Sequence, residues 1–142
     1  MIDEGLAEGT LADAVTLFRK AAGQKHSDAL VSLAVMYATG RGVEADPVAA
    51  MRYYQAAALR GNAHGVQGLG VLFANGEGVE KDWTEAIAHW VVAAAAGNET
   101  ADELLAEHFA PLSEAEAHAA IDRADQLAAL YGVNIFVEVA GN

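Results

Sequence analysis

Cysteine is absent from this chain of 142 residues, and proline occurs only twice. Without cysteine the chain has no disulfide framework, and no thiolate can bind a metal ion or act as a nucleophile. Aromatic residues make up only 7% of the sequence, whereas hydrophobic residues, alanine prominent among them, make up 54%. Small side chains and only two prolines favour closely packed helices, and the length fits about one domain.

Positive charge is also scarce, since 8 Lys and Arg residues face 20 Asp and Glu residues, for a net charge of −12. An acidic protein lacks the counter-charge that nucleic acid or an anionic membrane surface requires, so neither is expected as a partner. No apolar run approaches the roughly 20 residues that span a bilayer. Residues 1–5 show no basic or apolar signal region, which predicts the cytoplasm or another soluble compartment. The alternative is that this sequence is a fragment of a longer protein and that the longer protein is exported.

The chain does contain a repeat, because residues 33–62 recur 36 positions later as residues 69–98. A constant period of this size is typical of a solenoid, in which each unit buries its apolar face against its neighbours. The matched positions include Gly40, Gly42, Val43, Asp46, Gly61 and Asn62, which align with Gly76, Gly78, Val79, Asp82, Gly97 and Asn98.

Each unit is predicted to be a pair of helices joined by a Gly-x-Gly-Val turn. In the first unit the helices are expected at 28–39 and 47–59, with Gly40 as a left-handed end of the first helix. Asp46 is then the cap of the second helix. Val43 and Val79 are predicted to be buried. The aligned large residues that should couple the units are Leu33, Tyr37, Tyr54, Leu69, Phe73 and Trp90.

The spacing of Asp82 and Glu85, and that of Ser113 and Glu116, predicts two capping boxes. The second box starts a helix that Gly132 ends. The apolar face expected for this helix consists of Ala117, Ala120, Ile121, Ala124, Leu127, Ala128 and Tyr131.

We expect one domain over residues 1–142. The predicted parts are a half repeat at 10–26, two repeats at 27–62 and 63–98, a degenerate capping repeat at 99–132, and an extended tail at 133–142.

The combination of a small-residue first helix, the Gly-x-Gly-Val turn, an Asp helix cap and the ending Ala-Ala-x-x-Gly-Asn resembles the Sel-one-like repeat family, which is related to tetratricopeptide repeats. The resemblance covers about residues 10–132. It implies an all-α fold, a right-handed α/α superhelix of about three helix pairs with a C-terminal capping helix. It also implies a concave groove used for protein–protein contact, and most members of the family have no catalysis of their own. We expect no enzyme activity and no cofactor for this chain.

The other candidate chemistries fit the sequence less well. The Gly-x-Gly turns follow helices and not strands, so they do not predict a phosphate site. Glu114, His118 and Asp122 share one helix face but extend over about 12 Å, so they indicate a solvated face and no metal site. His89 and His108 are interpreted as packing or surface residues.

The resemblance also implies which positions line the groove, because the first helix of each tetratricopeptide-like pair faces the concave side. After Asn98 the chain has nine acidic residues and one basic residue, Arg123, so about −8 of the net charge lies in the last third. This distribution suggests a protein or peptide partner with a basic segment. The predicted groove positions are Asp28, Val31 and Val35, then His64, Gln67 and Val71, then Thr100, Glu103 and Glu107.

Two alternatives to an adaptor remain open. The apolar residues of the tail at 133–142 alternate with others, and such a segment can join two copies of the chain. The chain can also be a regulatory domain of a larger enzyme or signalling protein.

Overall fold

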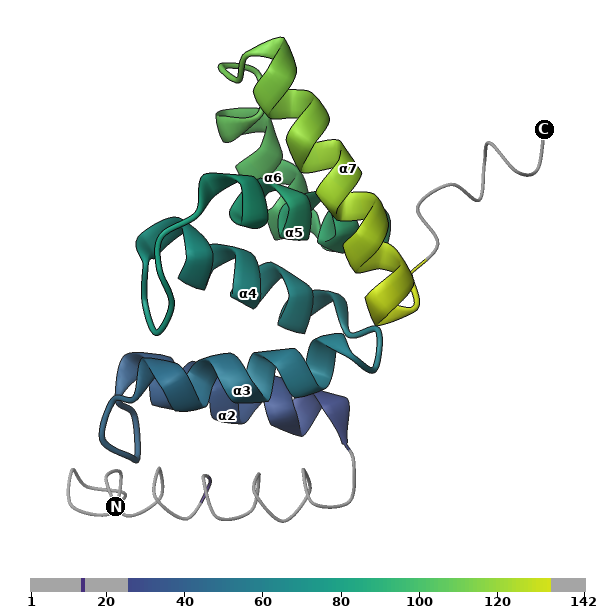
Figure 1. The fold of residues 1–142 in the computed structure, drawn as a ribbon. Coiled ribbons are helices and arrows are strands. Elements are labelled where there is room, and N and C mark those ends of the chain that lie inside the picture. Colours follow the sequence, from purple (N-terminus) through teal and green to yellow (C-terminus); the bar gives the residue numbers. More distant parts are fainter. Residues whose placement is uncertain (1–13, 15–25, 134–142) are drawn as a thin grey trace.

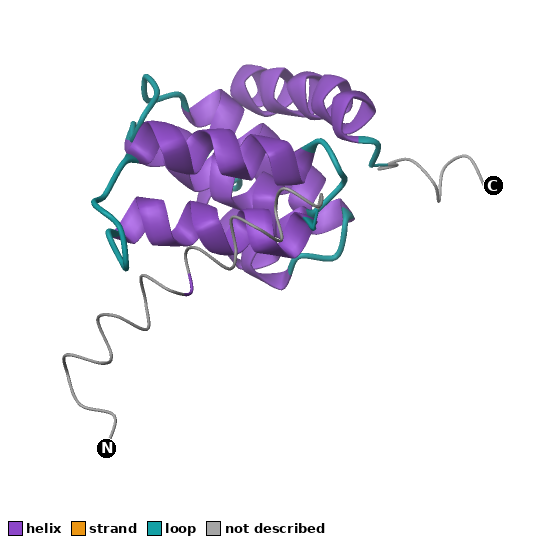
Figure 2. Cartoon of the chain, turned by 90° about the horizontal axis from the view of Figure 1, so that it is seen from below, coloured by secondary structure: helices purple, strands orange, loops and turns teal. Residues whose placement is uncertain are grey.

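The computed structural model describes Ala14 and residues 26–133. Within these residues every regular element is a helix and none is a strand (Figure 2), which confirms the all-α prediction. The division into half repeat, repeats, capping repeat and tail stays a prediction, and most of 10–26 and all of 134–142 lie outside the described residues. The helices are α2 (Ser27–Thr39), α3 (Pro47–Ala58), α4 (Ala63–Asn75), α5 (Trp83–Ala95), α6 (Glu99–His108) and α7 (Glu114–Tyr131).

The helices stack as an α/α solenoid (Figure 1). Helix α2 packs on α3, α3 on α4 and α4 on α5, so that each helix pair continues into the next. Both α6 and α7 pack against α5, whereas the described residues of α6 and α7 share little contact with each other. Helix α7 therefore crosses α5 and does not pair with α6 as the helices of the earlier repeats pair.

The two Gly-x-Gly-Val turns have the same geometry. Gly40 and Gly76 end α2 and α4 with φ of 73° and 69°, a left-handed conformation that suits glycine, as predicted. Asp46 N–H donates to Tyr37 O at 2.8 Å and brings the chain back for the second helix of the first pair. Val43 and Val79 were predicted to be buried, and this prediction was wrong because both are only half-buried. Their loops lie at the edge of the stack, where most neighbouring residues are exposed.

The core runs continuously through the stack. Leu33, Tyr54, Leu69 and Trp90, four of the six residues expected to couple the units, are buried. Trp90 is 2% exposed and is among the largest fully enclosed side chains. The core is therefore built mainly from the predicted apolar positions and from alanines of α3, α5 and α7.

Tyr37 and Phe73, the other two, are half-buried at the edge of this core. Tyr37 stacks on Tyr53 with ring centroids 5.5 Å apart, and Phe73 lies against His89 at 5.4 Å. Tyr53 and His89 are themselves 36 residues apart. The aromatic contact thus recurs once per repeat, between the two helices of a pair.

Helix α4 approaches both of its neighbours closely because it contains glycines. A Cβ atom at Gly68 would lie closer than 3.0 Å to the ring of Tyr54 on α3, and one at Gly70 equally close to the indole of Trp90 on α5. Each large side chain therefore rests on a place where α4 has no side chain. Closely packed backbones at the centre of the stack are the result.

The side chain of Glu85 on α5 binds α7 and does not complete a capping box. Asp82 accepts from Glu85 N–H at 3.1 Å, but the Glu85 carboxylate bonds to the Arg123 guanidinium, with Nη2 and Oε1 3.3 Å apart. The predicted capping box at Asp82 is therefore wrong, because the carboxylate that would complete it binds α7. The box of Ser113 and Glu116 is confirmed by both of its hydrogen bonds.

The buried stripe of α7 is narrower than the predicted apolar face. Ala120, Ala124, Leu127 and Tyr131 are buried against the core, but Ile121 is 39% exposed, so its assignment to the buried face was wrong. A helix that packs on one neighbour buries one stripe. Ile121 lies beside this stripe on the helix and remains open to solvent.

Candidate functional site

The nine predicted groove residues occupy equivalent positions on α2, α4 and α6. We call the surface that these nine residues form the interaction face. On α4, which is packed between α3 and α5, His64 is exposed and Gln67 and Val71 are half-buried, while most other positions are buried. The same side of α2 and α6 is at least as open. Exposed there are Asp28, Val35, Thr100, Glu103 and Glu107, and Val31 is half-buried.

Asn62 joins the start of α4 to the start of α2. Its Oδ1 accepts from the N–H groups of His64 and Gly65 at 3.0 and 3.3 Å, which caps α4. Its Nδ2 donates to Ser27 Oγ at 3.1 Å and to Asp28 Oδ1 at 3.0 Å. Asp28, one of the predicted groove residues, is thus already bonded within the chain.

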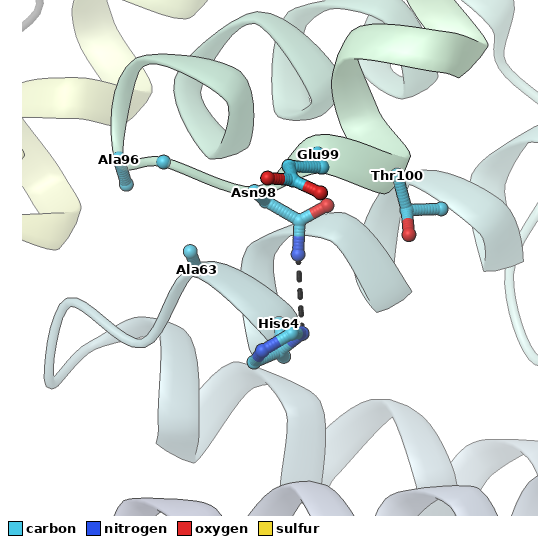
Figure 3. A pocket seen from close by; sticks show the side chains of 7 residues that line it. Ala63, His64, Ala96, Asn98, Glu99 and Thr100 are labelled. Atoms are coloured by element: carbon cyan, nitrogen blue, oxygen red, sulfur yellow. Dashed lines mark hydrogen bonds between the residues drawn. The ribbon is translucent and has the colours of Figure 1, made fainter.

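Asn98 forms the corresponding junction one repeat later (Figure 3). Its Oδ1 accepts from Ala101 N–H at 2.8 Å, and its Nδ2 donates to His64 Nδ1 at 3.1 Å. Because Nδ1 accepts this bond, the ring proton of a neutral His64 is on Nε2. The signal for these junctions was present in the repeated Gly-Asn pairs, but sequence reasoning did not assign them a role.

Two hollows open on or beside the interaction face. The first, of about 400 Å³, brings the predicted residues His64 and Thr100 together at the junction between α4 and α6. The second, of about 310 Å³, brings Val31 and Val35 together on α2. The other five predicted residues lie outside both hollows: Asp28, Gln67, Val71, Glu103 and Glu107. The remaining lining of the first is Ala63, Ala96, Gly97, Asn98 and Glu99, and that of the second is Ser32, Met36 and Arg41.

Negative charge on α6 is largely unpaired. Among the described residues, no lysine or arginine lies within ion-pair distance of Glu99, Asp102 or Glu103. Glu107 has only the imidazole of His108 nearby, at 3.7 Å. The α6 end of the interaction face therefore presents carboxylates that are free to meet cationic groups of another molecule.

Other titratable side chains serve packing. His89 is buried, with Nδ1 bonded to the Glu85 carbonyl and Nε2 to the Tyr131 hydroxyl, both at 2.8 Å. Burial lowers the pKa of His89 and raises that of Tyr131 to about 12, so both remain neutral at neutral pH. His108 is half-buried against Trp83, with ring centroids 5.2 Å apart. These contacts match the packing interpretation of the two histidines.

Residues considered as metal ligands do not converge. Glu114, His118 and Asp122 are all exposed along α7. In the part of the chain that the structure describes, no group of three or more His, Asp or Glu side chains is arranged to hold a metal ion. None of the described helices has the length and apolar character needed to cross a membrane.

Comparison with known proteins assigns the repeat. The sequence model of the Sel1 repeat family matches residues 27–62 and 65–98 of this chain. The crystal structure of a Sel1 repeat protein from Oxalobacter formigenes is 37% identical with a TM-score of 0.60, over 63% of this chain and 68% of that one. The chain belongs to the Sel1 repeat family. Sel1 repeat proteins generally mediate protein–protein interactions and are typically non-catalytic.

A longer Sel1-like structure extends the likeness. A protective antigen of uropathogenic Escherichia coli strains, which displays an SLR fold, is 27% identical with a TM-score of 0.79 over 84% of this chain. The present chain spans only 26% of the length of that protein. Comparison with curated proteins gives no significant match.

Proposed function

We propose that this Sel1 repeat chain is a non-catalytic scaffold that binds a protein or peptide partner across the interaction face of α2, α4 and α6. The observation that carries the proposal is the open side of α4. This helix packs between α3 and α5, yet His64 is exposed and Gln67 and Val71 are only half-buried. The equivalent positions on α2 and α6 are exposed, apart from the half-buried Val31, so one partner can contact the first helices of three successive pairs.

The chemistry of the face supports a partner with an uneven charge distribution. Toward α2 the face is partly apolar, with Val35 40% exposed and Val31 half-buried beside it. Toward α6 it is acidic, through Glu103 and Glu107. We therefore propose that apolar side chains of the partner meet α2 and that lysine or arginine side chains meet α6. Opposite charges of this kind speed association and select the orientation.

Charge reversal on α6 tests this proposal. The immobilised chain captures its partner, and the affinity of the purified partner is then measured at several NaCl concentrations. For the double variant Glu103→Lys/Glu107→Lys we expect affinity to fall about 10-fold or more at low salt, with a flatter dependence on salt.

A matched control reverses two exposed carboxylates away from the interaction face, in the variant Asp122→Lys/Asp125→Lys on α7. Its net charge equals that of the first variant, so general electrostatic steering changes equally. We expect it to bind within about twofold of the unmodified chain. Equal losses in both variants, or no loss in either, would contradict binding at α6.

A further inference from the structure

The two asparagine junctions differ in one hydrogen bond. At the first junction both N–H groups of the Asn62 amide have acceptors, Ser27 Oγ and Asp28 Oδ1. At the second junction, position 63 is alanine where position 27 is serine. The Asn98 amide consequently donates to His64 Nδ1 alone.

One N–H of Asn98 is therefore without an acceptor among the residues that the structure describes. The side chain belongs to a residue that is only 4% exposed, and it lines the hollow between α4 and α6 (Figure 3). An amide N–H in such a place forms its hydrogen bond with whatever occupies the hollow, because leaving a buried donor unbonded is costly.

The groups around this donor indicate which acceptor fits. Glu99 lines the hollow, and Glu103 lies one turn further along α6. Their negative charge disfavours a carboxylate or phosphate and favours a neutral oxygen that has a cation near it. The Thr100 hydroxyl on the same lining can donate or accept a further hydrogen bond.

We propose that the hollow between α4 and α6 is a subsite for a main-chain carbonyl group of an extended partner segment, with a lysine or arginine beside it. The carbonyl oxygen accepts from the free N–H of Asn98, and the cation lies against Glu99 and Glu103. This inference rests on the proposed function, since it names one contact that a partner makes on the interaction face.

The variant Ala63→Ser tests the subsite by copying the first junction. Its hydroxyl should give Asn98 the internal acceptor that Ser27 gives Asn62. The probe is the blocked peptide acetyl-Ala-Lys-Ala-Lys-Ala-amide, titrated against ¹⁵N-labelled chain. In the unmodified chain the side-chain amide resonances of Asn98 should shift, and Ala63→Ser should weaken binding about 3- to 10-fold without lowering Tm.

Two further variants separate a lost contact from a damaged fold. Ser27→Ala removes the corresponding hydroxyl at the first junction, and we expect it to cause no loss of affinity. Asn98→Asp keeps the oxygen that caps α6 but has no N–H to donate, so it should weaken peptide binding with α6 still formed. Weaker binding in Ser27→Ala equal to that in Ala63→Ser would overturn the subsite.

The outcomes also separate this inference from the proposed function. If the peptide binds and Glu103→Lys weakens it, while Asn98 resonances stay unmoved and Ala63→Ser binds normally, the subsite is refuted and the scaffold function stands. If the unmodified chain does not bind the peptide at millimolar concentration, the subsite is also refuted. The scaffold function is then judged separately by the captured partner and the α6 charge reversals.

Discussion

Gly68 and Gly70 determine how closely α4 approaches its two neighbours. Glycine is a poor helix former, and by helix propensity alone alanine at either position would be better by up to about 1 kcal/mol. Packing has the opposite preference, because Tyr54 and Trp90 occupy the space that each new methyl group would need. Both rings are buried, so they have little room to move aside.

We expect Gly68→Ala and Gly70→Ala each to lower the free energy of unfolding by about 1–3 kcal/mol, since overpacking outweighs the gain in propensity. Urea denaturation followed by circular dichroism measures the change. Gln67→Ala on the open side of the same helix is the control and should remain within about 0.5 kcal/mol. A stabilised Gly68→Ala variant would show that α3 and α4 are further apart than described.

Single residues also mark the limit of what the sequence predicts. Gly40 and Asp46 act on their own backbone neighbourhood, so a local pattern was enough to predict the turn and the cap. Gly68 has its role only because Tyr54, from another helix, rests on it. Val43 was expected to be buried, but its burial depends on how far neighbouring helices extend over the loop. That distance is not encoded in the loop itself.

At the scale of elements, α7 docks on α5 through its apolar stripe, the Arg123–Glu85 pair and one buried polar contact, between His89 and Tyr131. Because the Glu85 carbonyl can only accept, His89 carries its proton on Nδ1, and Nε2 accepts from the Tyr131 hydroxyl. Protonation of His89 would replace this acceptor by a donor and place a charge in the interface. The ring of Phe73 on α4 lies against that of His89. The charges of Glu85 on α5 and Arg123 on α7 also act on the imidazole.

This contact should make stability depend on pH. Burial, aided by the charge of Arg123, outweighs the opposing effects of the Glu85 carbonyl and carboxylate and keeps the pKa of His89 below its ordinary value of 6.5. The unfolded chain therefore binds more protons in acid than the folded chain does. The stabilising contribution is complete above about pH 6.5 and decreases as pH falls, by at most about 1.4 kcal/mol per pH unit.

We expect His89→Gln to lose stability between pH 7.5 and 5 less steeply than the unmodified chain, in parallel urea titrations. Glutamine can still accept from Tyr131, but it does not titrate. His118→Gln, at an exposed position on α7, is the control and should keep the original slope. Equal slopes in all three proteins would mean that His89 is protonated as readily when folded as when unfolded.

Helix α6 is the least firmly held of the described helices. It has ten residues, only Ala101 among them is buried, and its main contact is with α5 alone. Amides that open by small local fluctuations exchange faster than those that need global unfolding. We expect α6 amides to exchange with deuterium well before those of α4, as mass spectrometry of proteolytic fragments would measure. Slow exchange in α6 equal to that in α4 would contradict this ranking.

Element boundaries were predictable, whereas the packing of the last helix was not. Caps and glycines set the ends of the helices, and these are local signals. The crossing of α7 over α5 is held by long-range contacts, for example that of His89 with Tyr131, two residues that are 42 positions apart and follow no repeat. For the same reason Ile121 was assigned to the wrong side. The groove positions stay a prediction from the family resemblance, whereas the asparagine junctions depend on which side chains of neighbouring repeats meet in space.

At the scale of the whole molecule, the net charge of −12 opposes compactness. Most acidic side chains of α6 and α7 are exposed and lack cationic neighbours, so their mutual repulsion is screened by salt. We expect Tm to rise by several degrees between about 10 and 300 mM NaCl. Differential scanning calorimetry at fixed pH measures this shift.

The variant Asp122→Lys/Asp125→Lys changes the net charge by +4 and should show a smaller rise. Potassium chloride in place of sodium chloride should give the same curve, because screening depends on ionic strength and not on the identity of the cation. A Tm that falls with salt would mean that attractive pairs outweigh the repulsion.

The asparagine junctions also bear on how such chains can be lengthened by design. Asn62 precedes the second repeat, yet it caps the first helix of that repeat. A copied block of residues 63–98 thus begins without its own cap and relies on the asparagine of whatever stands before it. A block of residues 62–97 has the same length and starts with its cap. Designers who duplicate or graft units should therefore cut between glycine and asparagine, so that each block contains the cap of its first helix.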